Sequence, residues 1–257
     1  MDYISNNETP SGYGILKNLT QEELTALQAF KSHPSGVTNG IEDQYLMIYL
    51  FSKKLDVERA VVLLTNNLAF RKKYNVPFPV RKRDVNPELA KKASNYAATG
   101  HKDTLNRAIS YLTPSKLVPK DYPLEEYITH LFWNIDQTCH ESAVCHRNGL
   151  VIVEDLKDIS IFKHVDSRMK LDSGKSMSDI FPGRIAAIYL LHTPIYIRPL
   201  LAFAKTFVKS KLIKRVHVVK SKELLFEYFE KHQIITEFGG SMEFHYADYF
   251  DKLPSDY

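Results

Sequence analysis

The sequence predicts an α/β protein, in which a helical N-terminal lobe is followed by a mainly parallel β-sheet covered by helices. Two observations carry this prediction. Through the first ~80 residues, apolar side chains recur at helical spacing, and the period-two alternation of half-buried strands is absent. Further along, short apolar runs such as Gly149–Glu154 (GLVIVE) alternate with helical segments. Strands without polar alternation are typical of a parallel sheet that is buried on both faces.

The composition bounds the class of protein. The chain has 257 residues, of which 44% are hydrophobic and 25% charged, and its net charge is +4. The length allows one large domain or two small ones. No apolar run approaches the ~20 residues of a membrane-spanning helix, and the polar N-terminus is unlike a signal peptide. Two cysteines make no disulfide framework, so we expect a cytoplasmic protein with reduced thiols.

Three helices are predicted in the N-terminal lobe. The first covers Leu19–Ser32, because Thr20 is a favourable N-cap and two glutamates follow it in the first turn. The second covers Gln44–Lys53, with tyrosine and isoleucine side chains along one face. The third covers Val57–Tyr74, where apolar residues recur at helical spacing, and it ends before two prolines.

The second lobe begins with a short helix and then alternates strands with helices. The strands are predicted at Leu105–Thr113, Gly149–Glu154, Ala186–Leu191 and Val216–Val219. The helices are predicted at Pro87–Tyr96, Leu124–Cys139, Pro199–Lys209 and Lys222–Lys231, with one more before Phe181–Pro182. The chain is thereby divided into a flexible N-terminal segment (1–18), a helical lobe (19–85), a sheet lobe (86–246) and a C-terminal tail (247–257).

The predicted helix Pro199–Lys209 is apolar on nearly all sides. Its apolar residues are Leu200, Leu201, Phe203, Ala204, Phe207 and Val208. Few positions remain for a polar face, so the helix is either buried on every side or in contact with lipid. A core helix and a lid over an acyl-chain pocket are both open at this point.

A basic stretch overlaps this helix and continues past the last strand. No acidic residue interrupts Lys205, Lys209, Lys211, Lys214, Arg215, Lys220 and Lys222. A solvated face is the usual place for such residues. Beside an apolar helix they also suit an anionic membrane, at about 1 kcal/mol per basic residue near the surface. The residues expected to face the membrane are Lys205, Lys209, Lys211 and Lys214. Nucleic-acid binding is not expected, because no DNA- or RNA-binding motif accompanies the stretch.

No pattern of residues indicates catalysis or a metal centre. The chain has no Cys-x-x-x-x-x-Arg loop, no GxxxxGK[ST] or GxGxxG phosphate-binding loop and no GxSxG elbow. Two Cys-His pairs, at Cys139, His140 and at Cys145, His146, match no usual zinc spacing. Buried cysteines and helix-terminal histidines account for them better. We therefore expect a binding protein rather than an enzyme, with no metal and no catalytic cofactor.

Several short motifs occur in an order that resembles the CRAL-TRIO family of lipid-binding domains. In the first lobe they are YLMIYLFS, the basic pair Lys53 and Lys54, a turn that ends at Asp56, and the basic end of the third helix. In the second lobe they are GLVIVEDLKDIS, FPGR, HTP and EFGG, and the first of these ends its strand at Asp155. Within the family, the chain is similar to the lipid-binding domain at the N-terminus of a non-receptor tyrosine phosphatase.

The resemblance implies a lipid whose tails lie between the sheet and the helix Pro199–Lys209, which would act as a lid. It also implies that the head group is held by Lys53, Lys54 and Arg215, at the positions that phosphatidylinositol-binding members use. The expected ligand is thus a phosphoinositide or another anionic phospholipid. A cytoplasmic protein, peripheral on membranes, would take it up at an anionic membrane surface.

Two departures from the family's motifs bear on this expectation. Gly183 stands where an acidic residue is common, and His192 stands where an asparagine is usual. A gate salt bridge through that acid is therefore not expected. The resemblance leaves a second function open, because some relatives are scaffolds that engage small GTPases or other signalling proteins.

Overall fold

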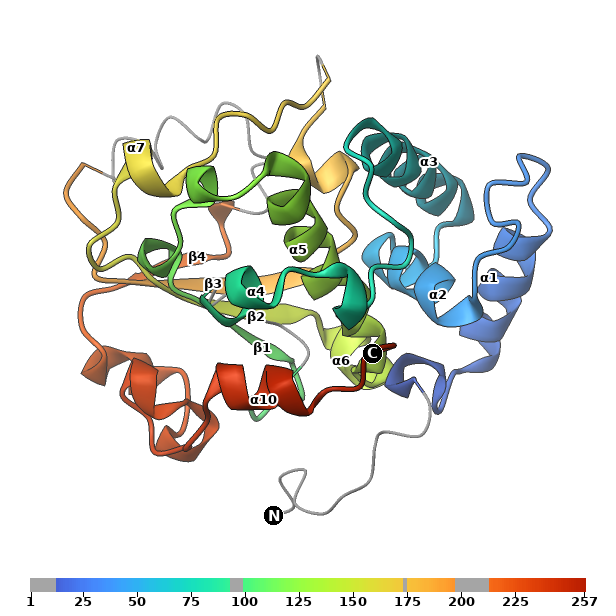
Figure 1. The fold of residues 1–257 in the computed structure, drawn as a ribbon. Helices are drawn as coiled ribbons and strands as arrows, with labels where there is room; N and C mark the ends of the chain where they lie inside the picture. Colours follow the sequence, from blue (N-terminus) through green and yellow to red (C-terminus); the bar gives the residue numbers. More distant parts are fainter. Residues whose placement is uncertain (1–12, 93–98, 173–174, 197–212) are drawn as a thin grey trace.

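The computed structural model of the chain describes residues 13–92, 99–172, 175–196 and 213–257. Within these ranges a group of helices lies beside a four-stranded sheet, which confirms the predicted α/β class (Figure 1).

The strands are β1 (Ile109–Leu112), β2 (Leu150–Asp155), β3 (Ile185–Leu191) and β4 (Val216–Val219). The α-helices are α1 (Gln21–Lys31), α2 (Asp43–Ser52), α3 (Val57–Lys73), α4 (Pro87–Lys92), α5 (Leu124–Asp136), α6 (Ala143–Asn148), α7 (Ile161–His164) and α10 (Tyr246–Lys252). Short 3-10 helices are η1 (Gly14–Leu16), η2 (Lys82–Asp84), η3 (Pro114–Lys116), η4 (Pro119–Asp121), η5 (Gln137–His140), η6 (Met177–Asp179), η7 (Glu223–Glu227), η8 (Lys231–Gln233) and η9 (Thr236–Phe238).

Two helices of the N-terminal lobe begin where side chains satisfy their first backbone N–H groups. The N–H of Glu23 donates to Thr20 Oγ1 (3.3 Å), and the N–H of Thr20 donates to Glu23 Oε2 (2.8 Å). This reciprocal capping box starts α1. In the same way, the N–H of Arg59 donates to Asp56 Oδ1 (3.0 Å) and starts α3.

Helix α2 lies at the centre of this lobe, in contact with α1, α3 and α6. Every residue from 44 to 51 is buried, whereas the sequence predicted one apolar face. That prediction was too narrow, because the run YLMIYLF is apolar without interruption and leaves no polar face. A helix of this kind has to be enclosed on all sides.

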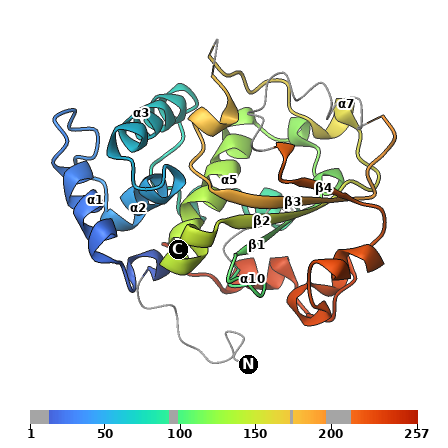
Figure 2. The same ribbon diagram turned by 180° about the vertical axis from the view of Figure 1, so that it is seen from behind.

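The four strands are parallel and lie in the order β1-β2-β3-β4. Right-handed crossovers place successive connections on the same side of such a sheet. Accordingly, α5 and α7 lie on one side, which we call the upper side, and α10 lies on the other with the 3-10 helices after β4 (Figure 1, Figure 2). The sheet therefore has an upper face toward α5 and α7 and a lower face toward α10.

The lower face is largely enclosed. Its buried residues are Ile109, Tyr111, Val151, Val153, Ala187, Tyr189, Leu191 and Val219. Tyr111 Oη donates to the Gln233 carbonyl (3.0 Å), and the ring of Tyr111 lies 5.1 Å from that of Phe238. Tyr189 meets Phe229 with ring centres 5.0 Å apart. Aromatic residues after β4 therefore close this side of the sheet.

A buried ion pair joins the two lobes. Arg71 of α3 donates from Nη2 to Asp136 Oδ1 of α5 (2.6 Å), and both side chains are only 2% exposed. The other carboxylate oxygen accepts from the N–H of Val80 (2.8 Å), while Arg71 also donates to Asn67 Oδ1 (2.7 Å) and to the Pro77 carbonyl (2.6 Å). Burial raises the pKa of the Asp136 carboxyl, and the guanidinium opposes that rise.

The last residues of the chain lie against the rest of the fold. Residues 247–257, expected as a tail, include most of α10, which packs against α4. Beyond it, the N–H of Lys82 donates to the carbonyl of Tyr257 (2.8 Å). The ring of Tyr257 stacks on His140 with centres 3.8 Å apart. The segment thereby connects the end of the first lobe with η5 of the second.

The predicted helix Lys222–Lys231 is wrong, because these residues form η7 and a turn. The N–H of Leu225 bonds to the carbonyl three residues earlier (3.1 Å), which is the 3-10 pattern. Leu224 and Tyr228 are 39% and 44% exposed, so only Leu225 and Phe229 face the core. The buried stripe is too narrow to stabilise a longer α-helix.

The first strand is shorter than the predicted Leu105–Thr113. Asp103 Oδ1 accepts hydrogen bonds from the N–H groups of Leu105 (3.0 Å) and Arg107 (2.9 Å). These bonds hold the chain in a turn until it joins the sheet at Ile109, as aspartate side chains often do.

Candidate functional site

The upper face of the sheet is apolar but only partly covered. Strand register places Ser110, Leu112, Ile152, Glu154, Ile188, Leu190, Val216 and Val218 side by side on it. Along β2, the residues on this face are partly exposed while their neighbours on the lower face are buried. Val218 is 44% exposed. Since parallel sheets are normally covered on both faces, this surface is suited to an apolar ligand.

Further apolar side chains border the upper face near α7. A small cluster, formed by Leu156, Ile159, Ile161, Ile188, Leu190 and Val216, covers part of the face. Next to it, Phe162 is 87% exposed and Ile195 is 84% exposed. Tyr196 Oη donates to the carbonyl of Ile159, which ties the segment after β3 to the segment before α7. The border of the site is thus apolar and open to solvent.

The predicted lid lies outside the described residues. This applies to Leu200, Leu201, Phe203, Ala204, Phe207 and Val208, and to the basic residues Lys205, Lys209 and Lys211. Of the basic residues expected to face the membrane, the structure describes Lys214, whose side chain is exposed. Residues 197–212 connect β3 with β4, two strands that contribute to the upper face. The lid itself stays a prediction.

Two of the three basic residues expected to hold the head group contact the segment that enters β3. Lys53 and Lys54 follow α2, and Lys53 Nζ donates to the carbonyl of Ser178 (3.4 Å). Arg215 precedes β4 and donates from Nη1 to the carbonyl of Ile185. The short segment between these two carbonyls therefore lies between two basic positions that are far apart in the sequence. Their binding role stays a prediction.

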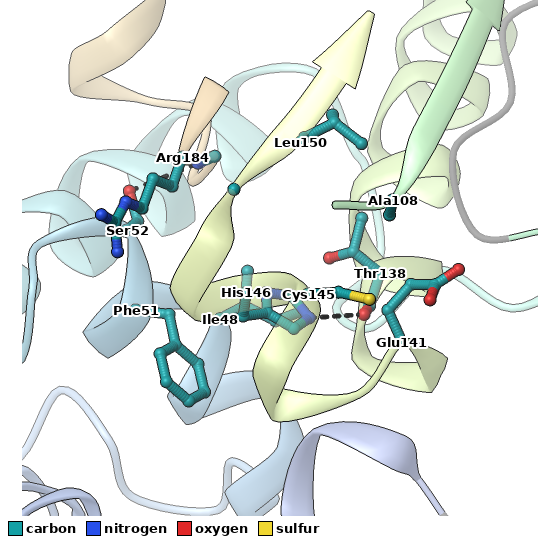
Figure 3. A pocket seen from close by; sticks show the side chains of 12 residues that line it. Ile48, Phe51, Ser52, Ala108, Thr138, Glu141, Cys145, His146, Leu150 and Arg184 are labelled. Carbon is teal, nitrogen blue, oxygen red and sulfur yellow. Dashed lines mark hydrogen bonds between the residues drawn. The ribbon is translucent and has the colours of Figure 1, made fainter. Parts of the chain in front are cut away.

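A small cavity lies next to this segment, between α2, α6 and the start of β2 (Figure 3). It is lined by Ile48, Phe51, Ser52, Ala108, Thr138, Glu141, Cys145, His146, Gly149, Leu150, Gly183 and Arg184. Inside it, His146 Nε2 lies 2.7 Å from the Thr138 carbonyl. The cavity volume is about 50 Å³, which holds a few water molecules and no acyl chain. The lipid pocket expected from the sequence is therefore not this cavity.

Polar side chains meet at the carboxyl ends of the strands. His192 Nδ1 lies 2.7 Å from Asp155 Oδ1, and Lys222 Nζ lies 3.9 Å from Asp155 Oδ2. Lys222 is partly buried and donates to the carbonyl of Glu237 (2.7 Å). Lys116 Nζ in turn donates to Glu237 Oε1 (2.6 Å). The motifs quoted around Asp155, His192 and Glu237 thus form one network, in which His192 supplies the polar contact to the strand aspartate.

The cysteines and their neighbouring histidines are enclosed in the fold. Cys139 and Cys145 are buried and unlinked, and burial raises the pKa of both thiols. Burial also lowers the pKa of His146 to about 4, so this ring stays neutral near neutral pH. The described ranges contain no group of three or more His, Cys, Asp or Glu side chains placed to hold a metal ion. In the same ranges, no helix combines the length and the apolar character needed to cross a bilayer.

One polar residue of the upper face was missed by the sequence reasoning. Glu154 was read as the last residue of an apolar strand, but register places it between Leu112 of β1 and Leu190 of β3. Burial among apolar residues raises the pKa of its carboxyl to about 7. The signal was present in GLVIVE, where a single acidic residue ends an otherwise apolar run.

Comparisons with known proteins agree with this architecture. The sequence pattern of the CRAL/TRIO domain matches residues 93–240. A CRAL-TRIO domain-containing protein of Dictyostelium discoideum is 46% identical over 249 residues, which cover 95% of this chain and 96% of that protein. A human alpha-tocopherol transfer protein-like protein is 26% identical over 190 residues, or 72% of this chain and 54% of that protein. Human tyrosine-protein phosphatase non-receptor type 9 is 22% identical over 212 residues, or 80% of this chain and 34% of that protein.

A solved structure shares the fold. The crystal structure of Sfh5 superposes with a TM-score of 0.50 at 14% identity, and the match covers 91% of this chain and 96% of that one. At this identity the match concerns the fold alone.

The resemblance derived from the quoted motifs is confirmed, including its phosphatase relative. This chain belongs to the CRAL/TRIO domain family.

Proposed function

We propose that this protein binds a lipid on the upper face of its sheet and carries it between membrane surfaces. CRAL/TRIO proteins are in general lipid-binding or lipid-transfer proteins. The observation that carries the proposal is the apolar, partly exposed face around Ile152 and Ile188. An acyl chain laid on this face removes apolar surface from water, at about 25 cal/mol per Å².

We propose further that the lipid is a phosphoinositide or another anionic phospholipid, with its head group near Lys53, Lys54 and Arg215. Lys53 and Arg215 donate to the backbone carbonyls of Ser178 and Ile185. A phosphate is a stronger acceptor than a carbonyl, and it is stable in a partly buried place only when such charged donors meet it. These donors support an anionic head group.

Contact with the membrane is proposed for the apolar border of the site. Phe162 and Ile195, more than four-fifths exposed, would enter the interfacial region of a bilayer. The exposed Lys214 would add attraction to anionic lipids. Replacement of Phe162 by aspartate is therefore expected to slow lipid transfer while leaving the fold intact.

The proposal is tested by filling the upper face. Transfer of labelled phosphatidylinositol between vesicles is measured for the wild type and for Ile152→Trp combined with Ile188→Trp. We expect at least about tenfold slower transfer, because two larger rings occupy the volume meant for the lipid. The matched control is Val62→Trp on α3, where the side chain is 60% exposed and away from the sheet. Unchanged transfer by a folded double variant would rule out the upper face as the lipid site.

The head-group assignment has a separate test. Lys54→Ala and Arg215→Ala are each expected to weaken phosphatidylinositol binding about tenfold or more, because a desolvated phosphate loses a charged partner. The control is Lys220→Ala, an exposed residue of the same basic stretch. Equal losses in Arg215→Ala and Lys220→Ala would identify the stretch as a general membrane patch. A stable protein that binds no lipid would instead favour the scaffold function.

A further inference from the structure

The upper face carries one ionisable side chain, and apolar residues surround it. Glu154 lies on β2, with Leu112 of β1 and Leu190 of β3 beside it in register. Ile152 precedes it on the same face, because side chains alternate along a strand. A carboxyl group therefore stands on an inner strand, in the row of residues at the carboxyl end of the surface on which we place the lipid.

This carboxyl has no partner within the described part of the chain. Desolvation is the one cause of its raised pKa of about 7, with no opposing cation or donor. The next residue, Asp155, points to the other face and is paired with His192. Glu154 is partly exposed, so water can reach its carboxyl group. A lipid that covers the face displaces this water, which is unfavourable unless the lipid itself offers a hydrogen bond.

We propose that Glu154 binds a hydroxyl group of the lipid, so that the upper face selects lipids that carry a hydroxyl at this depth. This inference rests on the proposed lipid-binding function of the same face. A hydroxyl suits the carboxyl in either protonation state, since it can donate to a carboxylate and accept from a carboxylic acid. Glu154 is then a residue that determines ligand specificity.

Other polar groups fit this position less well. A phosphate would be repelled by the carboxylate, and the basic residues proposed for it lie elsewhere. Register places Arg215 at the level of Val151 on β2, about 10 Å along the strand from Glu154. A quaternary ammonium group would pair with the charge, but it offers no hydrogen bond and has to lose its own hydration. Because the two positions are this far apart, one ligand can place a phosphate at Arg215 and a hydroxyl at Glu154.

The test compares probes that share one alkyl tail. Octadecanol, its methyl ether, octadecyltrimethylammonium and octadecyl phosphate are offered separately in phosphatidylcholine vesicles, and the labelled probe that co-elutes with the protein is measured. At about pH 8.5, where the carboxyl is charged and can only accept, the wild type is expected to retain octadecanol about tenfold better than the methyl ether, which has no hydrogen to donate. Glu154→Gln should reduce this preference, because its amide group can donate to the ether oxygen. Glu154→Leu should lose it while binding the methyl ether at least as well as the wild type does.

The control variant is Leu190→Met, which changes a neighbour on the same face without changing polarity and should keep the preference. Equal retention of octadecanol and its ether by the wild type, or an unchanged preference in Glu154→Leu, would overturn the inference. So would stronger retention of the ammonium probe than of octadecanol, or stronger retention of the phosphate probe than of octadecanol by a variant that combines Lys54→Ala with Arg215→Ala. If a folded wild type retains none of the probes and no phosphatidylinositol, both the proposed function and the inference that rests on it are refuted.

Discussion

Replacement of Asp136 by leucine is expected to destabilise the protein strongly, because it breaks the buried pair between the lobes. The Asp136 carboxylate accepts from Arg71 (2.6 Å) and from the N–H of Val80 (2.8 Å). Arg71 is 2% exposed, and its guanidinium lies between the rings of Phe78 and Phe132 at 4.5 and 4.1 Å. Without the carboxylate, this cation stays buried with neutral acceptors only.

The size of the effect follows from that burial. Removing one partner of a buried ion pair costs about 3–5 kcal/mol. Domains of this kind have a free energy of unfolding of about 5–15 kcal/mol, so the loss is a large share of the total. Arg71→Met alone should lose a similar amount, because it leaves the carboxylate unpaired. In Arg71→Met combined with Asp136→Leu no charge remains unpaired, and we expect a loss well below the sum of the two.

The assay is urea unfolding followed by fluorescence. The chain has one tryptophan, Trp133, which is buried in α5 one turn before Asp136 and reports directly on this region. The free energies of unfolding of the wild type, the two single variants and the double variant complete the cycle. Losses that simply add up would refute the reasoning, since they would mean that the two side chains act independently.

Two further predictions concern the sheet lobe. Because the folded protein raises the pKa of Glu154 from 4.5 to about 7, it holds a proton there that the unfolded chain has lost, so this residue lowers stability as pH rises through that range. Glu154→Gln should therefore gain up to about 3 kcal/mol above pH 7 and almost nothing near pH 4.5, measured as the difference between wild type and variant in urea unfolding. A gain that does not change with pH would contradict this. In the closing EFGG turn, a Cβ on Gly240 would lie 1.8 Å from the carbonyl oxygen of Ile234, so Gly240→Ala should lose about 3 kcal/mol. Gly183→Ala, with no atom within 4 Å of its Cβ, should lose less than about 0.5 kcal/mol, and similar melting temperatures for the two variants would contradict the expected steric conflict.

Much of the fold follows from local signals in the sequence. The N-cap Thr20, the helical spacing of apolar residues in Val57–Tyr74 and the apolar run of β4 predict their elements to within two residues, because these signals act locally. The enclosure of α2 and the 3-10 geometry after Lys222 depend on what surrounds these segments. Periodicity along the chain does not contain that information.

In the candidate site too, some features follow from local sequence signals and others depend on how the chain packs. The family motifs pointed to Lys53, Lys54 and Arg215, but the segment that Lys53 and Arg215 both contact is defined only by the packing of η6 and β3. The role of Glu154 was not predicted, because the face of the sheet on which its side chain lies depends on strand pairing rather than on composition. The lid predicted at 199–209 lies outside the described residues.

The central claim is that the protein holds a lipid on its upper face, and native mass spectrometry tests it most directly. The purified protein is incubated with vesicles that contain phosphatidylinositol, other phospholipids, sterols and isoprenoid lipids, and is then separated from them and weighed intact. We expect a folded protein that carries one lipid molecule, and a marked loss of that complex in Ile152→Trp combined with Ile188→Trp. A folded wild-type protein that carries no lipid from any of these classes would contradict the account.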